Sequence, residues 1–132
     1  SFGRSLVLGG ESEHAIADRQ YASLGEMCSA SLPAVDRYIV IATQGKDDVA
    51  ALQAALKMAA SYTAFVGSRR KFASYEDKLT AAGVSVAQIA TVRSPAGVHI
   101  NAVTPEEIAL SIMAEIIQTR RTARQQHAAD DA

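Results

Sequence analysis

The chain has 132 residues, about the length of one domain, so it can bury a single core. Apolar residues make up 48% and charged residues 20%, which excludes an intrinsically disordered chain. The formal net charge of -1 provides no basic field, so we expect no nucleic-acid partner. The single cysteine, the lack of an apolar run that could span a membrane and the lack of a signal peptide favour a cytoplasmic protein.

Residues 1–35 show the least regular pattern. Leu6-Val7-Leu8 before Gly9-Gly10 predicts a strand and a turn, but the following residues do not match the glycine spacing of a dinucleotide fingerprint. Residues 15–19 fit a second strand that ends in an acid, and a helix over residues 11–23 fits nearly as well. Cys28 falls in a predicted loop, and two interpretations of its thiol stay open: an inert group and a functional one.

Two strand–loop–helix units follow. Residues 38–43 are an unbroken apolar run, typical of a strand covered on both faces, and we expect it to be the central strand. Gly45 ends the run, and Asp47 or Asp48 can cap a helix whose apolar residues have helical spacing. Residues 62–66 are a second buried run, Gly67-Ser68 is a turn, and residues 69–82 are a predicted helix that Gly83 stops.

The last third of the chain predicts a helical turn and a short strand over residues 84–92, then a loop at Ser94-Pro95-Ala96-Gly97. Thr104, Pro105 and Glu107 form a capping box that begins the last helix. Its apolar residues fill more than one stripe, which predicts a two-fold homodimer with this helix near the interface. These residues are Ile108, Leu110, Ile112, Met113, Ile116 and Ile117. Residues 122–132 form an Ala/Asp tail that we expect to fray.

These elements predict one α/β domain over residues 1–132. Because consecutive parallel strands need helical crossovers, the expected fold is a three-layer sandwich with a mostly parallel sheet of three to five strands and helices on both faces.

The candidate site lies where two strands end and two helices begin. It consists of Thr43, Gln44 and Gly45 after the first strand, and Gly67, Ser68, Arg69 and Arg70 after the second. In a parallel sheet these carboxyl ends converge on one crevice, and exposed amides at a helix N-terminus beside cations suit a phosphate. The alternative is that residues 69–71 are a solvated first turn. Lys46 is either a further ligand contact or an ordinary loop lysine.

Catalytic motifs are absent from the sequence. It contains no Walker loop, no zinc helix and no nucleophile elbow, and His14, His99 and His127 share no metal-ligand spacing. We therefore assign no catalytic and no metal-binding residue, and favour a binding protein over an enzyme. Glu115 lies within an otherwise apolar helix, so it is either a structural ion pair or a site group.

Between residues 36 and 121, five short sequence motifs match those of a known protein family and lie in the same order. They are Ile41-Ala42-Thr43-Gln44-Gly45; Asp48 with residues 51–56; Val66-Gly67-Ser68-Arg69-Arg70-Lys71; Ser94-Pro95-Ala96-Gly97; and residues 104–112 with 114–116. This stretch resembles the C-terminal Rossmann-like domain of the XdhC/CoxI accessory proteins, which serve the maturation of xanthine dehydrogenase, carbon monoxide dehydrogenase and related molybdenum hydroxylases. Where that family has Ile-Gly-Ala before the last helix, this chain has Ile100-Asn101-Ala102.

The resemblance implies an accessory protein that binds molybdenum cofactor (molybdopterin), with a cysteine desulfurase as a further partner, and delivers the cofactor to the apo-hydroxylase. It also implies that the predicted anion site holds a pterin phosphate or a nucleotide moiety. Two alternatives stay open: an NAD(P)-binding or nucleotide-binding domain like that of an oxidoreductase, and an interaction module of nucleotide-binding fold without a ligand.

Overall fold

The computed structural model describes the backbone of residues 6–8, 19–21, 37–43, 45, 47–58 and 60–130. It describes side chains in the same ranges between residues 37 and 126. The chain divides into two compact units, Ser1–Val35 and Asp36–Ala132.

The first unit contains two parallel strands, β1 (Leu6–Leu8) and β2 (Arg19–Tyr21). β1 confirms the predicted strand. β2 lies later than residues 15–19, and the alternative helix over residues 11–23 is wrong at its C-terminal end, because β2 occupies it. The Gly9-Gly10 turn, His14 and Cys28 fall outside the described residues.

The second unit is built on a parallel sheet of three strands, β3 (Tyr38–Ile41), β4 (Tyr62–Phe65) and β5 (Val92–Arg93). This confirms the predicted parallel α/β fold. The order β3-β4-β5 places β4, not β3, in the middle of the described sheet, so the expectation of a central first strand is wrong. The burial pattern agrees with that order, since all four residues of β4 are buried, whereas Val40 in β3 is exposed.

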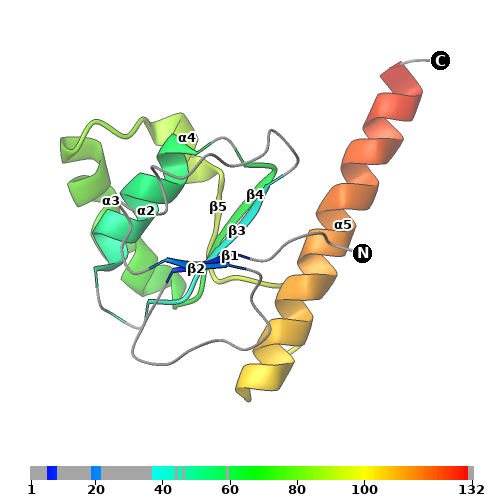
Figure 1. Ribbon diagram of the computed structural model, residues 1–132, viewed down its shortest axis with the longest axis horizontal. Helices are drawn as coiled ribbons and strands as arrows, with labels where there is room; N and C mark the ends of the chain where they lie inside the picture. The colour runs from blue at the N-terminus through cyan, green and yellow to red at the C-terminus, as the bar shows by residue number, and fades with distance from the viewer. Residues whose placement is uncertain are drawn as a thin grey trace. The chain divides into compact units, whose positions relative to one another are not determined.

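Helices cover the two faces of this sheet and make three layers (Figure 1). On one face, α2 (Asp48–Lys57), α3 (Arg69–Ala81) and α4 (Val86–Ala90) enclose a core around Leu52, Phe65 and Leu79. On the other face, α5 (Pro105–Asp130) packs Ile112 and Ile116 against Tyr62 and Ala64. Because side chains alternate along a strand, adjacent residues of β4 belong to different cores. Each core therefore fixes one helical layer against the same short strand.

The helix ends follow the capping residues in most cases. Ser68 caps α3, and Gly83, with φ 95°, lies just after the last turn of that helix as predicted. The predicted capping box of α5 is confirmed: the Glu107 amide donates to Thr104 Oγ1 at 3.2 Å, and the Thr104 amide donates to Glu107 Oε1 at 2.9 Å. The Val103 amide also donates to Glu107 Oε1 at 2.9 Å, and the two amide bonds from Thr104 and Val103 hold the pKa of Glu107 below its ordinary value, since they favour the charged carboxylate.

Helix α2 departs from the predicted cap. Asp47 occupies the N-cap position in the left-handed region, at φ 57°, and its side chain makes no capping bond. Asp48 is the first helical residue, and its side chain turns back into the protein. Asp47 therefore holds the predicted N-cap position, but the expected side-chain cap is wrong, because the Asp48 carboxylate accepts from Thr43, Gly45 and Tyr75 and the Asp47 side chain makes no capping bond.

Helix α5 is longer than its apolar pattern predicts. It runs for 26 residues to Asp130, through part of the segment expected to fray, because Ala, Arg and Gln are strong helix formers. The three strands have four, four and two residues, so α5 extends well past the sheet on which it packs (Figure 1). Just before it, Asn101 has φ 58°, a left-handed conformation that Asn tolerates better than most residues.

Candidate functional site

Three loops meet at the carboxyl edge of the sheet. The described residues 42, 43 and 45 follow β3, residues 66–68 follow β4 and residues 94–97 follow β5. Backbone bonds continue past the strand ends and hold the loops together, from the Val66 amide to the Ile41 carbonyl at 2.8 Å and from the Ala96 amide to the Phe65 carbonyl at 3.2 Å. The two predicted site segments are therefore neighbours, and residues 94–97 are a third segment that the sequence did not assign to the site.

The turn between β4 and α3 is shaped by Gly67 and Ser68. A Cβ atom on Gly67 would lie 2.6 Å from Phe65 Cε1, so only glycine fits without displacing that ring. The Ser68 hydroxyl accepts a hydrogen bond from the Lys71 amide at 3.1 Å and begins α3. A hydroxyl that accepts one bond still has a hydrogen to donate, so Ser68 can cap the helix and contact a ligand.

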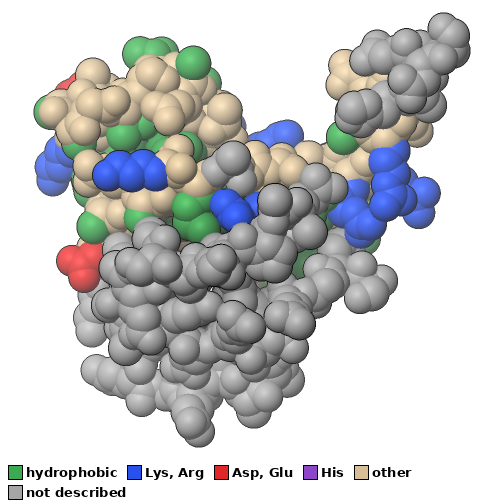
Figure 2. Space-filling model, turned by 45° about the horizontal axis from the view of Figure 1, so that its top comes forward, with side chains coloured by type: hydrophobic (Ala, Val, Ile, Leu, Met, Phe, Trp, Pro, Cys, Tyr) green, Lys and Arg blue, Asp and Glu red, His purple; other side chains and the backbone are tan. Residues whose placement is uncertain are grey.

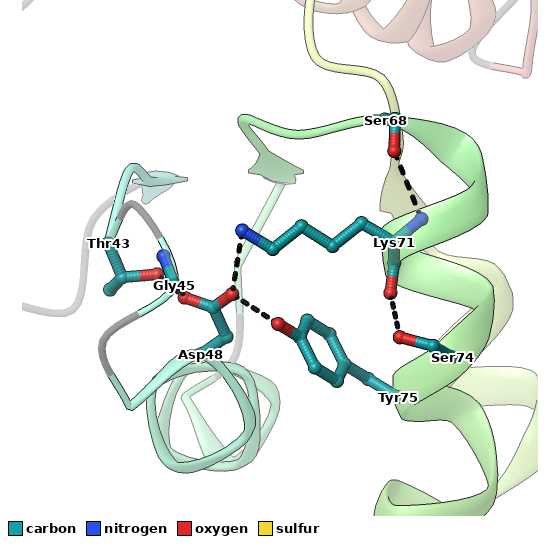
Figure 3. Close-up of polar contacts among 7 residues, drawn as sticks. All are labelled: Thr43, Gly45, Asp48, Ser68, Lys71, Ser74 and Tyr75. Carbon is teal, nitrogen blue, oxygen red and sulfur yellow. Dashed lines mark hydrogen bonds and ion pairs between the residues drawn. The ribbon is translucent and has the colours of Figure 1, made fainter.

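A buried carboxylate connects the loop after β3 to helix α3. Asp48 is 3% exposed, and its Oδ1 accepts from the Thr43 hydroxyl and from the Gly45 amide at 3.2 Å. Its Oδ2 accepts from the Tyr75 hydroxyl at 2.6 Å and lies 3.6 Å from Lys71 Nζ. Figure 3 shows the carboxylate between the loop on one side and the two α3 side chains on the other. Both Thr43 and Gly45 are thus held by a residue that sequence analysis treated only as a helix cap.

The charge state of Asp48 follows from these partners. Burial alone raises the pKa of a carboxyl group, but the bonds from Thr43 and Tyr75, the Lys71 cation and the Gly45 amide together lower it below 3.8. The bond to the carboxylate raises the pKa of the Tyr75 phenol. Asp48 is therefore an anion and Tyr75 a neutral donor at neutral pH.

Lys71 is the basic residue that reaches the loop after β3. Its side chain is 41% exposed, and its Nζ would lie 3.5 Å from a Cβ atom on Gly45, whose φ is +89°. Arg69 and Arg70, which the sequence assigned to the site, are exposed and form no ion pair within the described part of the chain. Gln44 and Lys46 lie outside the described residues.

A second buried carboxylate belongs to α5 itself and lies on the side of that helix that faces the sheet. Glu115 is 9% exposed, and its Oε1 accepts from the Tyr62 hydroxyl at 2.6 Å and from the Gly97 amide at 3.1 Å. The structural ion pair that the sequence allowed is not found among the described side chains. Burial and the bond to Glu115 raise the pKa of Tyr62 far above 10.0, so its hydroxyl stays protonated as a donor. Glu115 thus fixes the loop after β5.

The loop after β5 also contains a buried hydroxyl without a partner in the described structure, Ser94 Oγ. Unpaired buried polar groups cost free energy and are uncommon, so this atom marks the loop as part of the candidate site. Gly97, with φ 96°, holds the far end of the loop against α5, where a Cβ atom would overlap Ser111 Oγ.

The described residues show no group of three or more His, Cys, Asp or Glu side chains that could hold a metal ion. His99 is exposed. No helix in the described ranges is both long and apolar enough to cross a membrane.

A parallel sheet between helical layers, with its loops gathered at the carboxyl edge, is typical of Rossmann-like α/β domains. Comparison with known protein families identifies the particular family within this fold class. Residues 7–116 match the XdhC Rossmann domain, so the chain belongs to that family. The match reaches beyond the resemblance seen in residues 36–121 and includes part of the first unit.

Two proteins show how similar this chain is to known sequences and structures. The uncharacterized protein YqeB of Escherichia coli is 35% identical over 88 residues, which are 67% of this chain and 16% of that protein. The crystal structure of a protein from Bacillus halodurans, titled a xanthine dehydrogenase, matches with a TM-score of 0.62 and 26% identity. That match covers 80% of this chain and 30% of the other. The chain therefore spans less than a third of either relative.

Proposed function

We propose that this chain is an accessory domain in the maturation of molybdenum hydroxylases of the xanthine dehydrogenase or carbon monoxide dehydrogenase type. Membership of the XdhC Rossmann domain family is the observation on which the proposal depends. The domain binds molybdenum cofactor and delivers it to the apo-enzyme, with a cysteine desulfurase as the partner that sulfurates the cofactor. It acts as a maturation chaperone rather than as an enzyme.

The carboxyl edge of the sheet suits the phosphate end of such a cofactor. The first-turn amides of α3 attract an anion, and Ser68 supplies a hydroxyl, in a turn that Gly67 allows to pack against the Phe65 ring. Arg69 and Arg70 are exposed in the same turn, where cations are unfavourable unless an anion lies nearby. A ligand with a phosphate group compensates for both charges.

The other two loops extend this site beyond the phosphate. The Ser94 hydroxyl, buried without a partner among the described residues, supports a polar ligand contact at the loop after β5. Thr43 and Gly45, held by Asp48, lie at the end of β3 on the same edge. The fused rings of a pterin are rich in donors and acceptors, which matches three polar loops better than it matches an apolar pocket.

Titration calorimetry with molybdenum cofactor, NADP and inorganic phosphate tests this proposal. Loss of one charged contact, which contributes ~1.5–3 kcal/mol, weakens binding by about tenfold to a hundredfold, so the double variant Arg69→Ala with Arg70→Ala should weaken cofactor binding by about a hundredfold or more. Lys78→Ala, a change to an exposed lysine in the last turn of the same helix, is the matched control and should bind like the wild type. The proposed site is wrong if the double variant binds like the control, and the cofactor assignment is wrong if only NADP binds.

A further inference from the structure

Helix α5 has a second apolar stripe that does not face the sheet. Leu110, Met113 and Ile117 recur at helical spacing and are 64%, 37% and 45% exposed. At about 100° per residue, this stripe lies on the side of the helix away from Ile112 and Ile116, which are 7% and 6% exposed. Exposed apolar residues aligned along one helix face are typical of a contact surface. We call these three residues the outer stripe.

Charged residues extend the outer stripe at both ends. Glu106 lies one turn before Leu110, Arg124 lies two turns after Ile117, and both are exposed. The 18 positions from 106 to 124 make about five full turns, so the two charges share one side of the helix roughly 27 Å apart. Figure 2 shows basic side chains gathered on the projecting half of α5. The face is therefore acidic at its start, apolar in its middle and basic at its end.

We propose that the outer stripe binds the same face of a second copy of this chain, with the two α5 helices antiparallel across a two-fold axis. A centre near position 115 places Met113 opposite Ile117 of the second copy and Glu106 opposite Arg124 of the second copy. Leu110 then meets the turn at positions 120 and 121, where arginine stems supply apolar surface. Because the interface is isologous, each of these contacts occurs twice.

The charge pattern selects this occupant and this orientation. A face with an acid at one end and a base at the other end is complementary to itself when it is reversed, and only then. A parallel pair would place Glu106 against Glu106 and Arg124 against Arg124, which is repulsive. The apolar centre has three residues per copy, so the dimer should be concentration-dependent rather than obligate.

Charge exchange provides the sharpest test, measured by sedimentation over a dilution series of the full chain. Glu106→Arg alone creates two arginine pairs per dimer and Arg124→Glu alone creates two acid pairs, so each should weaken dimerisation by on the order of tenfold. The double exchange should return to wild-type affinity, and a 1:1 mixture of the two single variants should dimerise better than either alone. Failure of the double exchange to recover contradicts the antiparallel register.

The apolar centre is tested separately. Met113→Glu should weaken the dimer by about a hundredfold or abolish it, because each copy then buries a carboxylate against Ile117 of the other copy. Val86→Glu is the matched control: Val86 is 75% exposed on α4, on the opposite face of the sheet, and its change should leave dimerisation unaltered. Helix content by circular dichroism confirms that each variant is folded. A wild-type chain that stays monomeric at high micromolar concentration, or a control that weakens as much as Met113→Glu, overturns the proposal.

Discussion

The two buried carboxylates, Asp48 and Glu115, perform similar tasks with different partners. Each accepts a hydrogen bond at 2.6 Å from a tyrosine hydroxyl, and each also binds a loop amide at the carboxyl edge of the sheet. Asp48 has in addition a lysine whose side chain is 41% exposed, whereas Glu115 has no such ion pair within the described residues.

The two carboxylates differ in how far solvent can reach the side chains that bind them. Around Asp48, the partners Lys71 and Tyr75 are only half-buried, so this cluster can respond to pH, salt or a bound anion. Around Glu115, Tyr62 is 3% exposed and Gly97 packs on α5, so this cluster is sealed. The first carboxylate therefore positions the solvent-accessible part of the candidate site, and the second anchors α5 to the sheet.

The largest effect is expected at Gly97, on the sealed side of the comparison. A Cβ atom there would lie 2.9 Å from Ser111 Cβ and 3.0 Å from a backbone carbon, at a φ of +96°, so Gly97→Ala should cost about 3 kcal/mol of unfolding free energy. Gly83→Ala is the matched control, because its φ is +95° and nothing lies within 4 Å, and it should cost about 1–2 kcal/mol. Chemical denaturation measures both. Equal costs would mean that the overlap with Ser111 is relieved without strain.

A smaller loss is expected when the acceptor of the sealed cluster is removed. Glu115→Ala leaves the buried Tyr62 hydroxyl and the Gly97 amide without their acceptor and should cost about 2–3 kcal/mol. Glu115→Gln retains an oxygen acceptor and should cost less than half of that. A double-mutant cycle with Tyr62→Phe separates the contribution of the phenol from that of the amide. Additive costs would show that the 2.6 Å contact contributes nothing to stability.

The smallest effect is expected at the accessible carboxylate and is a dependence on pH. Because the folded-state pKa of Asp48 is lowered, its contribution to stability is present above 3.8 and is lost as the pH falls through the lower folded value. The stability difference between the wild type and Asp48→Asn should therefore shrink in that window. Lys71→Met removes the cation, moves the pKa of Asp48 upward and reduces the pH-dependent part. Denaturation at several pH values checks this, and parallel profiles for wild type and Asp48→Asn would contradict it.

The local elements were predictable from the sequence because their signals are local. The apolar runs identified β3 and β4, and Gly83 and the Thr104 box marked one helix end and one helix start. The two polar loops after β3 and β4 followed from the parallel arrangement alone. Their assignment to ligand binding stays a prediction for Thr43, Gly45, Gly67, Ser68, Arg69 and Arg70, and Gln44 lies outside the described residues.

The partners of the buried carboxylates were not predictable in the same way. Tyr62 and Glu115 are 53 positions apart, and Asp48 and Tyr75 are 27 positions apart. No periodicity within one helix indicates such pairs. A weak signal existed for Lys71, since Lys71 and Tyr75 are separated by one helical turn and therefore share a face of α3. That face meets Asp48 only after β3 and β4 have paired.

The sequence by itself determined the elements, their order and the edge at which their loops meet, because apolar runs, capping residues and glycines act over a few positions. Only the tertiary structure decided that β4 is the middle strand of the described sheet β3-β4-β5, that Asp48 is buried rather than a cap, and that the outer stripe of α5 stays exposed. These outcomes depend on which surfaces meet across the sheet, and a hydrophobic residue is equally hydrophobic whether it faces a neighbouring element or solvent.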